Sequence, residues 1–134
     1  MDGKELEMKD RKNFAFIFWA LALMMAVPGM AFANKAAVSI EAPKAAAKGE
    51  EVIIVINVTH DGNSPVHYVN WVNLKINGKD AKKWEYSPTK RPESGNFTLN
   101  YKYRVDADTK IAAEANCNLH GSAGPASATI KAKQ

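Results

Sequence analysis

The chain has 134 residues, of which 46% are hydrophobic and 24% charged, with 18 Lys and Arg against 14 Asp and Glu. This composition excludes a fully disordered chain, a collagen-like fibre and a multi-span membrane protein, and the length predicts one domain. The single cysteine excludes an internal disulfide and any site that needs two thiolates. The formal charge of +4 is not gathered into basic clusters, so no nucleic-acid partner is expected.

Residues 1–33 have the three-part layout of a secretory signal peptide. A charged start precedes an uncharged stretch from Phe14 to Val27, and the small residues Ala31 and Ala33 occupy the two positions that a signal peptidase reads. We expect a signal-peptide helix that is cleaved after Ala33, export to the periplasm, and a mature domain of residues 34–134. The alternative is an uncleaved membrane anchor facing the periplasm, because the segment from Phe14 to Ala33 could just cross a bilayer.

From residue 37 onward the hydrophobic pattern has a period of two, which is typical of β-strands. Residues 96–105 alternate strictly between apolar and polar, whereas the alternation of residues 67–76 slips near Trp71, which predicts a bulge. Asn77-Gly78 is a strong hairpin signal, and no segment has a convincing amphipathic-helix pattern. The expected strands are residues 37–42, 51–59, 67–76, 81–86, 96–105, 110–116 and 127–133. Seven short strands separated by turn signals predict an all-β, seven-stranded, immunoglobulin-like β-sandwich.

The three histidines of the chain and its one cysteine are expected to converge at one end of that sandwich. His60 ends the second strand, His67 begins the third, and Cys117 and His120 occupy the turn between the sixth and the seventh. If successive strands alternate in direction, these two loops are neighbours. One thiolate with several imidazoles suits a transition metal, and iron, copper and zinc are all compatible with it. The alternative for each residue alone is a buried thiol or an ordinary surface histidine.

The sequence around these four side chains resembles the iron-binding domain of the superoxide reductases, the family of neelaredoxin and desulfoferrodoxin. The resemblance is carried by HYVNWVNL from His67 to Leu74 and by CNLHG from Cys117 to Gly121. It implies a mononuclear non-haem iron bound by the three imidazoles in equatorial positions and by the thiolate of Cys117 on the axis. It also implies the reduction of superoxide to hydrogen peroxide, and a role for Asn118 in hydrogen bonds that tune the sulfur.

One equatorial histidine of the family pattern is missing from this chain. The segment that carries it in the family falls on Asn34-Lys35-Ala36, where the lysine matches and Ala36 stands in place of the histidine. Three consequences stay open: water completes the iron, the new amino terminus at Asn34 binds it, or the site holds a different metal. Lys35 is the candidate for the catalytic cation that attracts superoxide, with an ordinary solvated lysine as the alternative.

The function predicted from the sequence is a superoxide reductase-like iron protein that an external donor, such as a rubredoxin-like protein or a cytochrome, re-reduces. The alternative is a non-enzymatic metal-binding or electron-transfer module, either a degenerate family member or a copper protein of the cupredoxin kind. The mature domain has no methionine for the weak axial position of a cupredoxin, which favours iron over copper. Zinc is also less expected than iron. A membrane contact is expected only if residues 1–33 stay attached, and a homo-oligomer is left open.

Overall fold

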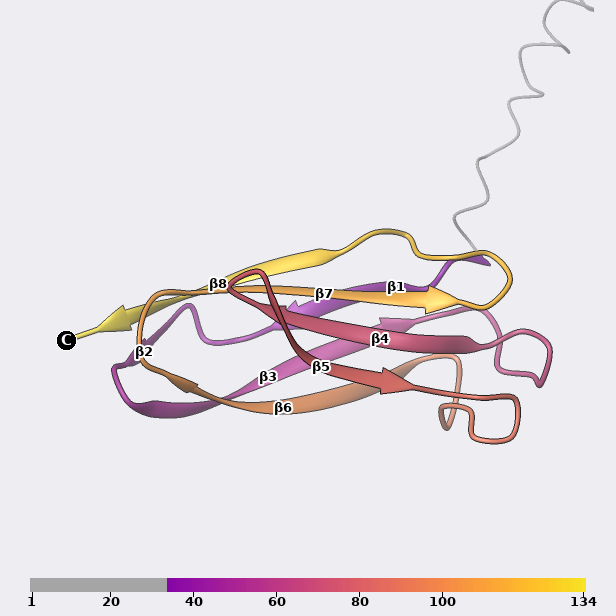
Figure 1. Cartoon of the computed structure of the whole chain (residues 1–134), viewed down its shortest axis with the longest axis horizontal. Helices are drawn as coiled ribbons and strands as arrows, with labels where there is room; N and C mark the ends of the chain where they lie inside the picture. Colours follow the sequence, from indigo (N-terminus) through magenta and orange to yellow (C-terminus); the bar gives the residue numbers. More distant parts are fainter. Residues whose placement is uncertain (1–33) are drawn as a thin grey trace, which may run out of the picture. The chain divides into compact units, whose positions relative to one another are not determined.

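The computed structural model describes residues 34–134, which form eight strands in two sheets (Figure 1). The strands are β1 (Ala37–Glu41), β2 (Ala45–Ala47), β3 (Glu50–Thr59), β4 (Val69–Ile76), β5 (Lys79–Glu85), β6 (Phe97–Val105), β7 (Thr109–Cys117) and β8 (Ala126–Lys133). The predicted signal segment, residues 1–33, lies outside the described residues. Within residues 34–134, no helix is long and apolar enough to cross a membrane.

The two sheets have the orders β1-β3-β6 and β2-β8-β7-β4-β5, and this arrangement confirms the predicted all-β sandwich. All strand pairs are antiparallel except β2 with β8, which run parallel with Ala45 opposite Lys131. The short strand β2 adds an eighth strand to the seven expected. Its three alanines show no alternation and have low β-propensity, so only their pairing with β8 makes them a strand.

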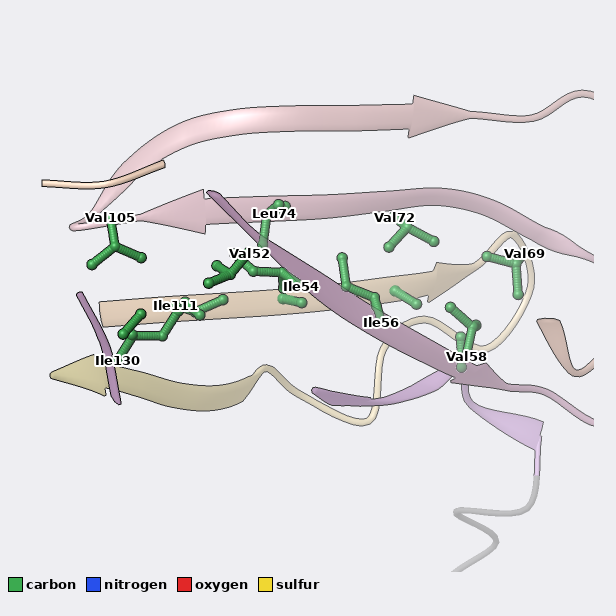
Figure 2. Close-up of a cluster of buried hydrophobic side chains, with 14 of the residues drawn as sticks. Val52, Ile54, Ile56, Val58, Val69, Val72, Leu74, Val105, Ile111 and Ile130 are labelled. Atoms are coloured by element: carbon green, nitrogen blue, oxygen red, sulfur yellow. The ribbon is translucent and has the colours of Figure 1, made fainter. Parts of the chain in front are cut away.

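The core lies between the two sheets, where the inward positions of β3 and β4 meet (Figure 2). Ile54 and Ile56 of β3 and Leu74 of β4 have no exposed surface. Each such side chain contributes about 1.5–3 kcal/mol through burial. Because β3 and β4 are anchored along their length in this core, the loop between them starts and ends at well-defined points.

The start of β4 differs from the prediction in a way that matters for the site. The strand begins at Val69, and the preceding His67 lies in a turn in which its N–H and C=O each hydrogen-bond Ser64, at 3.1 and 2.9 Å. The expected bulge is present, as a shift in the pairing of β4 with β7 between Val69 and Trp71. Val69 therefore lies opposite Cys117, and His67 is carried past the end of the sheet.

Candidate metal centre

Three loops meet at the end of the molecule opposite the C-terminus (Figure 1). They follow β3, β5 and β7. The first holds His60 and His67, and the third begins at Cys117 and holds His120. The alternation of strand direction thus brings the predicted residues to one end, as the sequence pattern indicated.

The donor atoms of His60, His67 and Cys117 all lie within 4.8 Å of one another. His60 is 4% exposed and Cys117 is 1% exposed, whereas His67 is half-buried. His120 falls outside this tight group of three and is exposed, but its Nδ1 lies 3.2 Å from His67 Nε2 and 3.8 Å from Cys117 Sγ. The four predicted side chains therefore come together, with His120 as the exposed member.

The hydrogen bonds of His60 leave one ring nitrogen available to a metal. Its Nδ1 lies 2.7 Å from the carbonyl oxygen of Gly62, an acceptor, so Nδ1 carries the proton. The other nitrogen, Nε2, is buried and has no hydrogen-bond partner within residues 34–134. A buried polar atom without a partner costs about 1–3 kcal/mol, and a metal ligand held by a backbone carbonyl at its second nitrogen has this arrangement. The orphaned Nε2, with a buried sulfur beside it, fits a transition-metal ion.

Cys117 is held by a closed turn. Its N–H donates to the carbonyl of Gly121 and its own carbonyl accepts from the N–H of Gly121, both at 3.0 Å. Gly121 has φ +78°, a left-handed conformation that glycine adopts without steric cost. The backbone N–H of His120 points at the sulfur, 3.4 Å away. The turn therefore fixes the sulfur and the His120 backbone relative to each other.

Asn118 connects this turn to the loop that carries His67. Its Oδ1 accepts from the N–H of Tyr68 at 2.9 Å, and its Nδ2 donates to the carbonyl of Val66 at 3.1 Å. Its own N–H donates to the carbonyl of Tyr68 at 3.1 Å. The sulfur of Cys117 lies 4.0 Å from Oδ1, at the limit of a sulfur contact. Asn118 thus clamps the residues on both sides of His67, a role that the sequence did not reveal because the partners are 50 and 52 residues away.

Gly62 belongs to the site, although the sequence analysis did not single it out. A Cβ built on it would lie 2.8 Å from His67 Nδ1, closer than real Cβ contacts come. Only glycine lets the ring of His67 approach the backbone here, and the carbonyl of the same residue holds His60. The Asp61-Gly62 pair is a turn signal in the sequence, but this signal does not predict which side chain packs against Gly62.

Ala36 lies beside the turn that carries Cys117. It is fully buried, its N–H donates to the carbonyl of Gly121 at 3.2 Å, and its carbonyl accepts from the N–H of Ala123 at 2.8 Å. The position at which the resemblance requires a histidine is therefore adjacent in space to the ligand-bearing turn. Lys35, one residue earlier, is half-buried.

Comparisons with known proteins agree with this geometry. The desulfoferrodoxin family model matches residues 30–122. A structure of the superoxide reductase (neelaredoxin) from Ignicoccus hospitalis is similar, with a TM-score of 0.64 and 20% identity over 78% of this chain and 86% of that chain. A structure described as a putative superoxide reductase from Thermotoga maritima has a TM-score of 0.58 and 21% identity over 73% and 86%.

A third similar structure is the CARDB domain of a Pyrococcus furiosus protein in complex with di-metal ions. Its TM-score is 0.56 with 17% identity, over 75% of this chain and 96% of that chain. No curated protein matches the chain significantly. At these identities, the three structures establish a shared fold.

Proposed function

Because the chain belongs to the desulfoferrodoxin family, we propose that it is a superoxide reductase. In this proposal one iron ion is held by the Nε2 atom of His60, the imidazoles of His67 and His120, and the thiolate of Cys117. The protein reduces superoxide to hydrogen peroxide with electrons from an external donor, such as a rubredoxin-like protein or a cytochrome. Residues 1–33 are proposed to act as a signal peptide that directs the domain to the periplasm.

The observation that carries this proposal is the buried, unpartnered Nε2 of His60 beside the buried sulfur of Cys117. A purely structural histidine would satisfy that nitrogen with a protein hydrogen bond. A site with one sulfur and several imidazole donors selects a transition metal over the hard cations Mg²⁺ and Ca²⁺. Membership of the desulfoferrodoxin family, for which the resemblance implies non-haem iron, supports iron among the possible metals.

The reaction consumes one superoxide, one electron and two protons for each hydrogen peroxide. Iron supplies the electron when it is bound. His60 and Cys117 hold it from the buried side, with the His60 ring oriented by the Gly62 carbonyl. The exposed ring of His120 marks the side from which superoxide and protons reach the centre. Lys35 is proposed to draw the anion in, since its neighbour Ala36 bonds to the ligand-bearing turn.

A non-enzymatic metal-binding module is the second candidate, and one observation favours it. The chain has three histidines in all, and buried Ala36 occupies the position of the fourth. A metal with one fewer imidazole would have a different coordination and potential. The CARDB domain with di-metal ions has the same fold, so this fold also serves proteins of another kind.

The test is metal content and superoxide kinetics of the full chain purified without oxygen from iron-replete cells. We expect near-stoichiometric iron, a broad thiolate absorption band on oxidation, and one hydrogen peroxide per superoxide consumed in the presence of a reductant. Cys117→Ser should lose the band and the activity, whereas Ser127→Ala, on the exposed side of β8, should keep both. Bound iron with no acceleration of superoxide decay would refute the reductase and leave the metal-binding module.

A further inference from the structure

The loop between β5 and β6 supplies none of the four proposed metal ligands, yet it touches the segment that carries His60. Asn96 accepts a hydrogen bond from the backbone N–H of His60 through its Oδ1, at 3.2 Å. Asn63 donates through its Nδ2 to the carbonyl of Pro92 at 2.7 Å. Two hydrogen bonds, one near each end of residues 92–96, therefore hold this loop against the start of the β3–β4 loop.

Gly95 lies between these two hydrogen bonds and makes the closest approach. A Cβ built there would overlap the carbonyl oxygen of His60, and it would lie 3.4 Å from both the nitrogen and the oxygen of Gly62. Gly95 is not among the residues with a left-handed backbone in the described part of the chain. The φ angle of Gly95 therefore does not exclude alanine, and the obstacle that the structure shows is the collision with the His60 carbonyl.

A displacement at Gly95 would reach the rings of both His60 and His67 through Gly62. The carbonyl oxygen of Gly62 accepts from His60 Nδ1 and so orients the His60 ring. The Cα of Gly62 faces His67 so closely that a Cβ would lie 2.8 Å from its Nδ1. Binding sites must hold their ligands within about 0.5 Å of the working geometry, so a shift of Gly62 would disturb the positions of both rings.

We propose that Gly95 is a positioning residue of the metal centre: its lack of a side chain sets the place of the His60 carbonyl and, through Gly62, the orientation of the two imidazoles. The inference rests on the metal centre of the proposed function and is independent of whether that centre reduces superoxide. Asn96 contributes to the same positioning through its bond to the His60 N–H.

The test uses Co²⁺ as the probe, titrated into the metal-free full chain, with the cobalt absorption spectrum as a report of ligand geometry. We expect Gly95→Ala to weaken Co²⁺ binding by about tenfold or more, as removal of outer partners does at other metal sites, and to shift the cobalt bands. Asn96→Ala adds no bulk and should weaken binding by about three- to tenfold. The control is Asn100→Ala, which replaces an exposed asparagine within β6. It should change neither the Co²⁺ affinity nor the cobalt spectrum.

The outcomes separate the two proposals. If the unaltered protein binds no Co²⁺, both the metal centre and this inference fail. If it binds Co²⁺ and both variants bind with the same affinity and spectrum, the inference is wrong and the metal centre stands. A lower melting temperature with unchanged cobalt binding would show a purely structural loop and would also overturn the inference. If Gly95→Ala does not fold, Asn96→Ala decides the question by the same criteria.

Discussion

Replacing Asn118 with alanine should loosen the loop that carries His67. The substitution removes the Oδ1 that accepts from the Tyr68 N–H at 2.9 Å and the Nδ2 that donates to the Val66 carbonyl at 3.1 Å. Both bonds join the β3–β4 loop to the turn that follows β7. The backbone hydrogen bond from the Asn118 N–H to the Tyr68 carbonyl stays, and so does the contact between the rings of His120 and His67, so the two segments remain together.

The size of the effect follows from the surroundings of the two partners. Tyr68 is only 8% exposed, so its N–H would lose its acceptor where water has little access. Val66 is 71% exposed, so water can replace the lost donor at its carbonyl. A net hydrogen bond is worth about 0.5–1.5 kcal/mol, and the solvated carbonyl lies at the low end. We expect a loss of about 1–2 kcal/mol, which lowers the melting temperature of a domain of this size by roughly 5–15 °C.

The assay is thermal and urea unfolding of the metal-free protein, because bound metal would add its own stabilisation. Asn100→Ala is the matched control, since it removes an exposed asparagine that lies within β6, paired with Val55 of β3, and not in either of these loops. A second measurement, Co²⁺ affinity, should fall for Asn118→Ala because His67 is held less firmly. Equal melting temperatures for Asn118→Ala and the control would refute the conclusion that the Asn118 side chain stabilises the β3–β4 loop, whatever the effect on metal binding.

Two further predictions concern Ala36 and Asp108. Ala36→His should destabilise the metal-free protein by roughly 1–3 kcal/mol through overpacking of a fully buried position, yet tighten iron binding or speed peroxide formation. Unchanged metal affinity and peroxide formation in titration and kinetics would mean that Ala36 does not face the centre. The Lys131 ammonium, 2.8 Å from the Asp108 carboxylate, and the Ala132 N–H hold the pKa of that carboxyl below its usual value. This stabilisation is present above the ordinary aspartate pKa of about 3.9 and is lost as the pH falls through the lower folded value. Asp108→Asn should therefore melt slightly below wild type at neutral pH and converge with it in acid; parallel curves down to low pH would contradict the assignment.

The strands and the inward-facing residues could be predicted well from the sequence. Strict alternation with period two marked β6, because residues two apart point to the same face of a strand. The slip in the alternation near Trp71 marked the bulge of β4. The pattern missed β2, because its three alanines do not alternate between apolar and polar residues. It also wrongly placed His67 in a strand, although β4 begins at Val69. The turn closed on Ser64 and the clamp from Asn118 decide that His67 precedes β4.

The choice of ligand candidates could also be predicted, because few residue types bind transition metals and this chain has three histidines and one cysteine. Their convergence followed from the alternation of strand direction. The difference in burial between the ligand candidates did not follow from the alternation of strand direction. Burial of His60 and exposure of His120 depend on how three loops pack against each other, and a single sequence contains no direct record of that packing.

The sequence by itself determined the all-β class, the inward faces of the strands and the set of donor atoms, since each depends on residue types and on spacings along the chain. Only the tertiary structure decided which donors lie together, which nitrogen of His60 is left without a partner, and that Gly62 and Gly95 are places where a side chain would displace the rings. The reason is that these features are distances between segments far apart in the chain, as His67 and His120 are, 53 residues apart. Such distances are set by the packing of two sheets and three loops rather than by local preference.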